Sequence, residues 1–424
     1  MKPLEPSAAA NSPLPARTGL SMGTVALLST ALFISYFDRG ILATASPLVQ
    51  SDFGLSKTQL GFLFAAFYWS YAPLQPLAGW LAQRLEVRYV LAGGIALWSL
   101  STVLTGFATS LVVLVGLRTL LGVGESVVYP SNAKFLGQNA EIHERGRANG
   151  LIAVGQALGP TAGTVLSGLV MARWGWRPAF ILFGAVSLTW LVPWLIVTRP
   201  ARASVDASSL PVPYAVLLRE RSLWGTSLGH FCGNYSYYFM LTWLPLLLVK
   251  EFGFTLAQMA IIGGCIYGIQ AVSAALMGWW CDHLILRGAS ANRVLKTAVI
   301  VGLVGVTAAM ALCAGAGARL SVALMMLAGI GIGMQSAPMN SITQTLGGAR
   351  TAGQWMGVQN LVANMAGVLA PPFTGFLVDT TGSYFWAFMV AALVTLLGVM
   401  AYAVIIERVE PVLWPAAPSA MPPH

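Results

Sequence analysis

The sequence predicts an all-α membrane protein, with twelve transmembrane helices in two six-helix bundles related by pseudo-twofold symmetry. Three observations carry this prediction. Of the 424 residues, 57% are hydrophobic and only 9% are charged, whereas a soluble domain carries about 25% charged residues. The apolar residues fall into runs of about 20, the length that crosses a bilayer as a helix. One long polar stretch separates six of these runs from six others.

The runs divide the chain into five parts. Residues 1–20 and 409–424 are rich in Pro and Ala and are expected to be disordered cytoplasmic tails. The two bundles are predicted over 21–198 and 223–408, joined by a cytoplasmic linker at 199–222. The predicted spans are 22–46, 58–82, 89–108, 112–133, 147–171, 178–198, 223–249, 258–281, 294–315, 319–342, 353–376 and 384–406.

The two bundles show features of parallel repeats. The second span ends in Gly79-Trp80 before a short basic loop, and the eighth ends in Gly278-Trp279 before another. The fifth and eleventh spans are both rich in glycine and contain proline. Repeats of this kind are common in secondary transporters.

Basic residues set the expected orientation, because cytoplasmic loops carry an excess of Lys and Arg. If the N-terminus is cytoplasmic, only Lys57, Arg173, Arg177, Lys250 and Arg319 lie on the opposite side. The cytoplasmic side then holds Arg84, Arg88, Lys134, Arg145, Arg147, Arg199, Arg202, Arg219, Arg221, Arg287, Arg293, Lys296, Arg350 and Arg408. We therefore expect a multi-pass protein of the bacterial inner membrane with both termini in the cytoplasm.

Several other classes of protein are excluded. The net charge of +9 is spread over short breaks between apolar runs, so it forms no patch for nucleic acid. The four cysteines form no CxxC pair, which argues against a disulfide framework or a zinc site. There is no P-loop to use ATP, and no set of nucleophile and base or metal ligands that would make an enzyme. We expect no cofactor apart from protons as coupling ions.

Four charged residues lie well inside predicted spans, away from the span ends, and all are in the first bundle: Asp38, Arg39, Arg118 and Glu125. Each charge near the bilayer centre costs roughly 2.5–3.5 kcal/mol, so these side chains must face the bundle interior or water. Arg118 and Glu125 are seven residues apart, about 10 Å along a helix, which disfavours pairing with each other. We therefore predict two cross-helix pairs, Asp38 with Arg118 and Arg39 with Glu125.

Such pairs have two interpretations. They could simply hold helices together, but a buried ion pair is rarely the most stable solution for that purpose. Alternatively, they form a transport site, in which a buried carboxyl group gains and loses protons. We favour the second interpretation. His230, in the seventh span, is either a proton relay or a histidine near a helix end, and the sequence favours the latter.

Four segments resemble one known family. The run Tyr36-Phe37-Asp38-Arg39-Gly40, followed by Ala45-Ser46-Pro47, resembles the first helix of the anion:cation symporter family of the major facilitator superfamily. The run from Arg118 to Glu125, ending in Tyr129-Pro130, is similar to the fourth helix of that family. The segments Gly233-Asn234-Tyr235 with Leu241-Thr242-Trp243-Leu244-Pro245, and Gln359-Asn360-Leu361 with Gly367 and Pro371, are similar to the seventh and eleventh. The resemblance implies the major facilitator fold.

The resemblance also implies roles for matched positions. Arg39 would bind the substrate carboxylate, Asp38 and Glu125 would be the protonation sites, and Arg118 would support the ion pairs. The pocket would be lined by Tyr36, Tyr71, Gln156, Asn234, Tyr235, Tyr237, Asn360 and Asn364.

The gate loops depart from the family pattern at one position. Gly79 and Arg84 in the first bundle, and Gly278 and Asp282 in the second, match the family. The acidic residue expected before Arg84 is replaced by Gln83, which weakens an expected contact of the cytoplasmic gate.

The sequence therefore predicts a monomeric secondary transporter that takes up a small organic anion, such as a sugar acid, together with protons. Exchange or uniport of organic anions is an alternative that needs no protonation site. Proton-driven efflux of drugs or cations is a second alternative, against which Arg39 and Arg118 argue.

Overall fold

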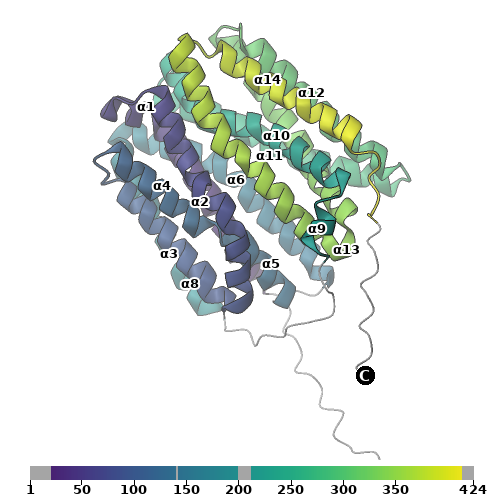
Figure 1. Ribbon diagram of the computed structural model, residues 1–424. Coiled ribbons are helices and arrows are strands. Elements are labelled where there is room, and N and C mark those ends of the chain that lie inside the picture. The colour runs from purple at the N-terminus through teal and green to yellow at the C-terminus, as the bar shows by residue number, and fades with distance from the viewer. Residues whose placement is uncertain (1–20, 140–141, 199–211, 413–424) are drawn as a thin grey trace, which may run out of the picture.

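The computed structural model describes residues 21–139, 142–198 and 212–412, which form a helical bundle (Figure 1). The helices stand side by side, and those of the first part of the chain lie beside those of the second. The predicted tails at 1–20 and 409–424 and the linker at 199–222 fall mostly outside the described residues, so the domain boundaries stay a prediction.

The first part of the chain forms six rods. Two of them consist of two helices each, α4 with α5 and α7 with α8. The helices are α1 (Met22–Phe53), α2 (Lys57–Arg84), α3 (Val87–Thr105), α4 (Leu111–Glu125), α5 (Val128–Asn139), α6 (Ile142–Trp174), α7 (Trp176–Thr189) and α8 (Leu191–Val197).

The second part begins with a short helix inside the predicted linker and continues with long ones. The helices are α9 (Tyr214–Leu217), α10 (Arg221–Leu246), α11 (Leu256–Leu286), α12 (Ala291–Cys313), α13 (Ala318–Thr381) and α14 (Phe385–Met400). A π-helical turn extends α10 over Leu247–Glu251, and another extends α14 over Ala401–Ile405.

The long helix α13 is two rods joined at one residue. Gly348 has φ 59° and ψ −174°, which breaks the helical backbone and favours glycine. The arms on either side correspond to the predicted spans 319–342 and 353–376. Counting these arms separately, the described residues hold twelve rods at the twelve predicted positions, so the predicted fold class is confirmed.

Nine stretches among the described residues are both long and apolar enough to cross a membrane. The three remaining rods are α2, α6 and α10. These same helices carry most of the contact between the two parts of the chain, because α2 packs on α13, α6 on α11 and α10 on α1. The helices α2, α6 and α10 are thus more polar than the others, and they lie inside the molecule rather than against lipid.

The two parts of the chain approach each other most closely toward one end of the bundle, the end where α1 and α13 finish and α2 and α11 begin. A Cβ on Gly375 would lie 2.2 Å from the Lys57 backbone oxygen, and one on Gly168 would lie 2.4 Å from the Ala260 Cβ. The Lys57 ammonium group also forms a 2.7 Å ion pair with Glu251. We call this the closed end.

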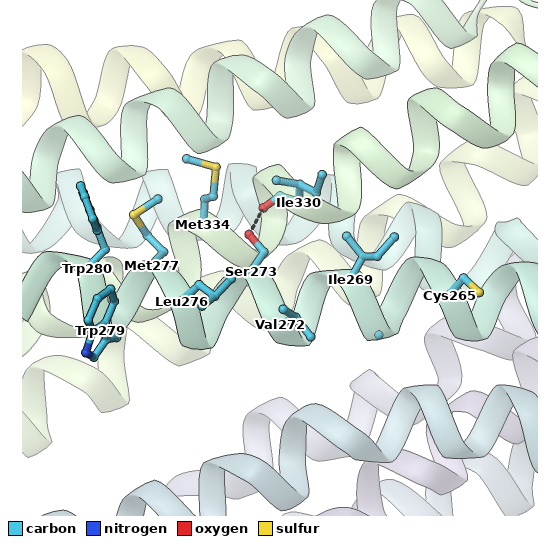
Figure 2. Close-up of a pocket in the computed structure, with 11 residues that line it drawn as sticks. Cys265, Ile269, Val272, Ser273, Leu276, Met277, Trp279, Trp280, Ile330 and Met334 are labelled. Atoms are coloured by element: carbon cyan, nitrogen blue, oxygen red, sulfur yellow. Dashed lines mark hydrogen bonds between the residues drawn. The ribbon is translucent and has the colours of Figure 1, made fainter.

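Toward the other end, α6 and α11 no longer cover each other. Leu158 of α6 is 49% exposed, and Val272 and Leu276 of α11 are 58% and 60% exposed. A cavity of about 800 Å³ lies along this part of α11, with Ile330 and Met334 of α13 on its wall (Figure 2). Its walls are almost entirely apolar, and none of its lining residues belongs to the predicted site.

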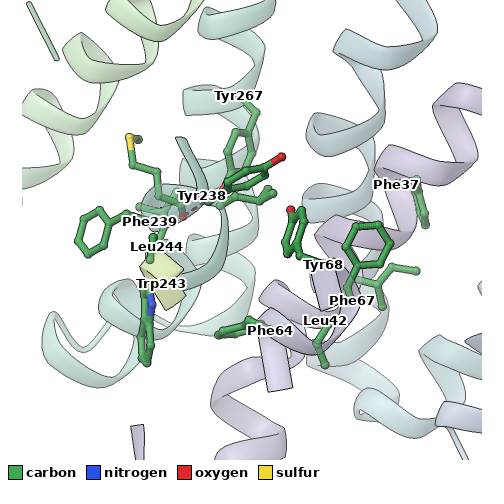
Figure 3. Close-up of a cluster of buried hydrophobic side chains, with 14 of the residues drawn as sticks. Phe37, Leu42, Phe64, Phe67, Tyr68, Tyr238, Phe239, Trp243, Leu244 and Tyr267 are labelled. Atoms are coloured by element: carbon green, nitrogen blue, oxygen red, sulfur yellow. Dashed lines mark hydrogen bonds between the residues drawn. The ribbon is translucent and has the colours of Figure 1, made fainter. Parts of the chain in front are cut away.

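Aromatic side chains fill the seam between the two parts (Figure 3). The rings of Phe64 and Trp243 lie 5.9 Å apart edge to face, and those of Tyr68 and Tyr238 lie 4.7 Å apart. Such contacts bury large apolar areas and add about 0.5–1.5 kcal/mol each beyond that burial. The seam therefore holds α2 against α10 at the level where the charged residues lie.

Candidate functional site

Arg39 and Glu125 form a buried ion pair. The Arg39 Nε and Nη2 atoms donate to the same oxygen of Glu125, Oε2, at 3.0 Å and 2.9 Å. Arg39 is 9% exposed and Glu125 is 1% exposed. Ser35, one turn before Arg39 on α1, donates to the same oxygen at 2.7 Å. The predicted pairing of Arg39 with Glu125 is confirmed.

The guanidinium group of Arg39 is surrounded by aromatic rings. Its central carbon lies 4.5 Å from the ring centre of Tyr36, 4.7 Å from that of Phe67 and 4.8 Å from that of Tyr71. Phe67 and Tyr71 lie four residues apart and thus on one face of α2. Ring faces attract a cation, so this cage keeps a positive charge in an otherwise apolar place.

The other predicted pair, Asp38 with Arg118, is wrong. Asp38 is 1% exposed, and neither of its carboxylate oxygens has a hydrogen-bond partner among the described residues. The carboxylate is still within electrostatic range of both Glu125 and Arg118, and the charge of Glu125 acts on it more strongly. Asp38 and Arg118 therefore influence each other within one buried cluster of charges, but their side chains do not come within hydrogen-bond distance, so no pair forms.

Arg118 is buried without an ion pair among the described residues. It is 4% exposed, and its Nε has no hydrogen-bond partner. The charges that act on it most strongly are those of Asp38 and, after it, Glu125. A buried, unbonded guanidinium is costly, so this position favours any arrangement that brings an additional negative charge nearby.

A chain of polar groups leads away from the cage through the first half. The hydroxyl oxygens of Tyr36 and Tyr129 lie 3.0 Å apart, and the Gln156 amide donates to the Tyr36 hydroxyl at 3.2 Å. These residues come from α1, α5 and α6. Tyr36 and Gln156, both predicted for the pocket, therefore lie together, and Tyr36 also touches Arg39.

Polar groups of the second half lie opposite. Tyr237 of α10 is within electrostatic range of Tyr36 and Arg39. The Tyr238 hydroxyl donates to the Asn364 side-chain oxygen at 2.8 Å, and the Asn364 amide donates to the Asn360 carbonyl at 2.8 Å.

Asn234 is also directed toward α13, because its amide donates to the Ala363 carbonyl at 3.4 Å. Through these bonds the structure joins Asn234, Asn360 and Asn364 at the contact between α10 and α13.

Tyr235 is not brought to this place. It is 5% exposed, and its ring contact is with Phe231 on its own helix. On a helix, Tyr235 lies roughly 160° away from Tyr237, so the two residues face different neighbours.

The predicted gate loops are described only in part. Gly79 and the side chain of Arg84 fall outside the described part of this loop. Gly278 packs against α13, where a Cβ would lie 3.2 Å from the Ala337 Cβ. Asp282 is exposed, and it takes part in no ion pair among the described residues.

The sequence prediction did not include Ser35, Phe67, Tyr68 or Tyr129 as members of the site. Three of them could have been found from helical spacing. Ser35 lies four residues before Arg39, Phe67 four before Tyr71, and Tyr129 four after Glu125, and such positions share a helix face. Tyr68 could not have been found in this way, because it depends on the contact with Tyr238 across the seam.

The arrangement offers one exchangeable contact for an anion, the Arg39 guanidinium, and several polar groups. Arg39 can bind a carboxylate through two N–H groups once Glu125 is neutralised or displaced. Among the described residues, no group of three or more His, Cys, Asp or Glu side chains could hold a metal ion.

Several proteins similar to this chain are named as transporters of organic acids. The chain is 32% identical over 391 residues to a probable sulfoacetate transporter of Cupriavidus necator, covering 88% of this chain and 90% of that protein. It is 29% identical over 413 residues to a D-galactonate transporter of Escherichia coli, covering 91% and 96%. It is 28% identical over 410 residues to a hexuronate transporter of Bacillus subtilis, covering 92% and 94%.

The fold is also similar to that of solved membrane transporters. A bacterial homologue of the human lysosomal transporter Spinster, in an inward-facing and occupied conformation, superimposes with a TM-score of 0.76 at 17% identity, covering 90% of this chain and 96% of that one. The family model of the Major Facilitator Superfamily matches residues 28–368 and 288–423. The chain therefore belongs to the Major Facilitator Superfamily, a family of membrane transporters.

Proposed function

We propose that this protein takes up a small organic anion together with protons, by alternating access. The observation that carries the proposal is the buried pair of Arg39 and Glu125, with the guanidinium held among the rings of Tyr36, Phe67 and Tyr71. The pair occupies the two N–H groups that a substrate carboxylate would need. An anion can therefore bind to these N–H groups only when Glu125 no longer accepts their hydrogen bonds.

Protonation is the simplest way to release Arg39. A neutral Glu125 no longer balances the guanidinium charge, and an incoming carboxylate takes its place through a charge-assisted bond. Asp38 is the second proton site, because a carboxyl group that is 1% exposed and unbonded gains much from losing its charge. Arg118, close to both acids, is a supporting cation.

The substrate is an organic acid with hydroxyl groups. Relatives at about 30% identity are named for sulfoacetate, D-galactonate and hexuronate, all small organic anions. The amide and phenol groups at the contact of α10 and α13 offer hydrogen bonds but no described charge. This division supports recognition of the carboxylate in the first half and of hydroxyl groups in the second.

The closed end is proposed to face the periplasm and the other end the cytoplasm, so the described conformation is inward-facing. This agrees with the excess of basic residues in the loops expected to be cytoplasmic. The protein acts as a monomer in the bacterial inner membrane, with both termini in the cytoplasm. The loops at Gly79–Arg84 and Gly278–Asp282 are the proposed cytoplasmic gates.

The test is uptake into proteoliposomes containing the purified protein, with radiolabelled D-galactonate, glucuronate and sulfoacetate as probes. Symport predicts accumulation above the external concentration when the outside is acidic, and loss of accumulation when a proton ionophore is added. Uptake that needs an internal anion and ignores the pH gradient would instead identify an exchanger. Failure of all organic acids to enter would refute the proposal.

A further inference from the structure

The segment 406–412 is bound to the start of α12. It follows the π-helical turn after α14 and has no helical structure (Figure 1). The Lys296 ammonium group donates to the Ile406 carbonyl at 2.7 Å, and the Val409 N–H donates to the Asn292 side-chain oxygen at 2.9 Å. Lys296 and Asn292 lie four residues apart, so they share one face of α12. We call this segment the C-terminal strap.

The strap continues over the junction between the two arms of α13. The Val412 N–H donates to the Leu346 carbonyl at 3.0 Å, two residues before Gly348. A Cβ on Gly348 would lie 4.0 Å from the Pro411 Cβ. The strap is therefore anchored both to α12 and to the first arm of α13, and it covers the residue at which the second arm begins.

Apolar side chains of the strap are buried together with the second arm. Ile406 and Val409 are 0% and 4% exposed, and they belong to one buried apolar cluster with Leu346 of the first arm and Trp355 of the second. Burial of apolar surface favours this arrangement. The Trp355 indole also donates to the Thr226 hydroxyl of α10 at 2.9 Å. The start of the second arm is thus held against the strap and α10.

The far end of the second arm forms the closed end. Gly375 lies 27 residues beyond Gly348, about 40 Å along a helix, and a Cβ there would lie 2.2 Å from the Lys57 backbone oxygen. On an arm of this length, a tilt of about 6° at Gly348 displaces Gly375 by about 4 Å. Such a displacement separates the two backbones, so the contact at the closed end depends on the angle between the arms.

We propose that the C-terminal strap holds the second arm of α13 at the described angle, and that its release lets the closed end open. Gly348 can adopt other backbone conformations because it has no Cβ, so the strap and its cluster supply the restraint that the backbone lacks. A contact at one end of the second half then controls a contact at the other end. This inference does not depend on the substrate or on the coupling ion.

The test measures opening of the closed end in purified protein in lipid nanodiscs. A cysteine replaces Thr164, which is 2% exposed and faces Gly263 of α11, and its rate of modification by a maleimide is followed. Mass spectrometry of the peptide that contains position 164 gives this rate separately from that of Cys265, which is also exposed.

Two substitutions loosen the strap by different bonds. Lys296→Met removes the donor and keeps the apolar stem, and Asn292→Ala removes the acceptor. Thr395→Val is the matched control, because it removes a buried 2.5 Å contact with the Ser236 hydroxyl that joins α14 to α10 outside the strap. Size-exclusion profiles and melting temperatures establish which variants are folded, and one folded strap variant is sufficient for the test.

The inference predicts that each strap variant raises the modification rate at position 164 about three- to tenfold, the weight of one hydrogen bond. Lys296→Met should have the larger effect, since its donor is charged. Thr395→Val should lower the melting temperature and leave the modification rate unchanged.

Unchanged modification in both strap variants and in their double variant would show that the strap only covers the end of the bundle. An equal rise in Thr395→Val would show that any loss of stability opens the closed end. Either result overturns the inference.

Discussion

Asp379 at the end of α13 caps the start of α2 across the seam by binding Thr58. Its carboxylate accepts the Thr58 backbone N–H at 2.7 Å and the Thr58 hydroxyl at 2.6 Å, and the Lys57 N–H at 3.0 Å. An acid at a helix N-terminus satisfies free N–H groups and complements the helix dipole. Here the cap comes from the opposite half, so it must be lost whenever the closed end opens.

Asp379→Asn should therefore favour opening of the closed end. The amide keeps the size of the side chain but loses the charge, and a charge-assisted bond contributes about 1.5–3 kcal/mol. We expect the rate of modification by an impermeant maleimide to rise about tenfold or more for a cysteine introduced at Thr164, which is 2% exposed and faces Gly263 of α11. Asp52→Asn is the control, because Asp52 pairs with Arg177 inside the first half. Similar increases in both variants would contradict the role given to Asp379.

Arg39→Lys should nearly abolish substrate binding although the charge is kept. An ammonium group cannot make the two parallel N–H bonds of a guanidinium. Removing such a contact at a buried site typically costs 2–5 kcal/mol, at least about 30-fold in the dissociation constant measured by calorimetry. Lys57→Arg, which keeps a cation at the closed end, serves as the control and should bind substrate normally. Wild-type affinity in Arg39→Lys would show that Arg39 does not hold the anion.

Glu125→Gln should separate exchange from accumulation. Glutamine resembles protonated glutamate, so Arg39 is permanently available to substrate. We expect counterflow of labelled substrate between proteoliposomes and medium to persist, while accumulation driven by an acidic exterior disappears. Accumulation against a gradient in this variant would show that the coupling proton binds elsewhere.

Asp38→Asn should impair proton-coupled cycling without unfolding the protein. Both carboxylate oxygens lack partners among the described residues, so the substitution breaks no bond and removes a buried charge. We expect the melting temperature to stay the same or rise, and the rate of proton-driven uptake to fall about tenfold or more, as for loss of a proton-transfer group. A lower melting temperature together with normal uptake would make Asp38 a structural residue only.

Gly367→Ala should disfavour the described conformation. A Cβ at Gly367 would lie 2.7 Å from three ring carbons of Tyr68, which itself packs on Tyr238. Overpacking of this kind typically costs 1–3 kcal/mol. Gly357→Ala, on the same helix, meets nothing within 4 Å and should be silent in the maleimide assay used for Asp379. Equal labelling of the two variants would show that Tyr68 moves aside easily.

Most of the fold and part of the candidate site can be predicted from the sequence. Runs of about 20 apolar residues place the spans, because a bilayer requires that length. The pair of Arg39 and Glu125 follows from counting buried charges, but the unpaired state of Asp38 does not, since it depends on the relative position of α1 and α4. The cap on Thr58 is likewise hidden, because Asp379 lies 321 residues away. Contacts across the seam depend on the relative position of the helices, and the periodicity of the sequence carries no information about that position.

The glycine at 348 has a mechanical consequence. A single residue with φ 59° joins the two arms of α13 and interrupts its helical backbone. Glycine adopts many backbone conformations, so this junction is a short hinge at which the two arms can change their mutual angle. The arm that carries Asn360 can therefore tilt when an anion binds while the arm that carries Thr343 keeps its packing.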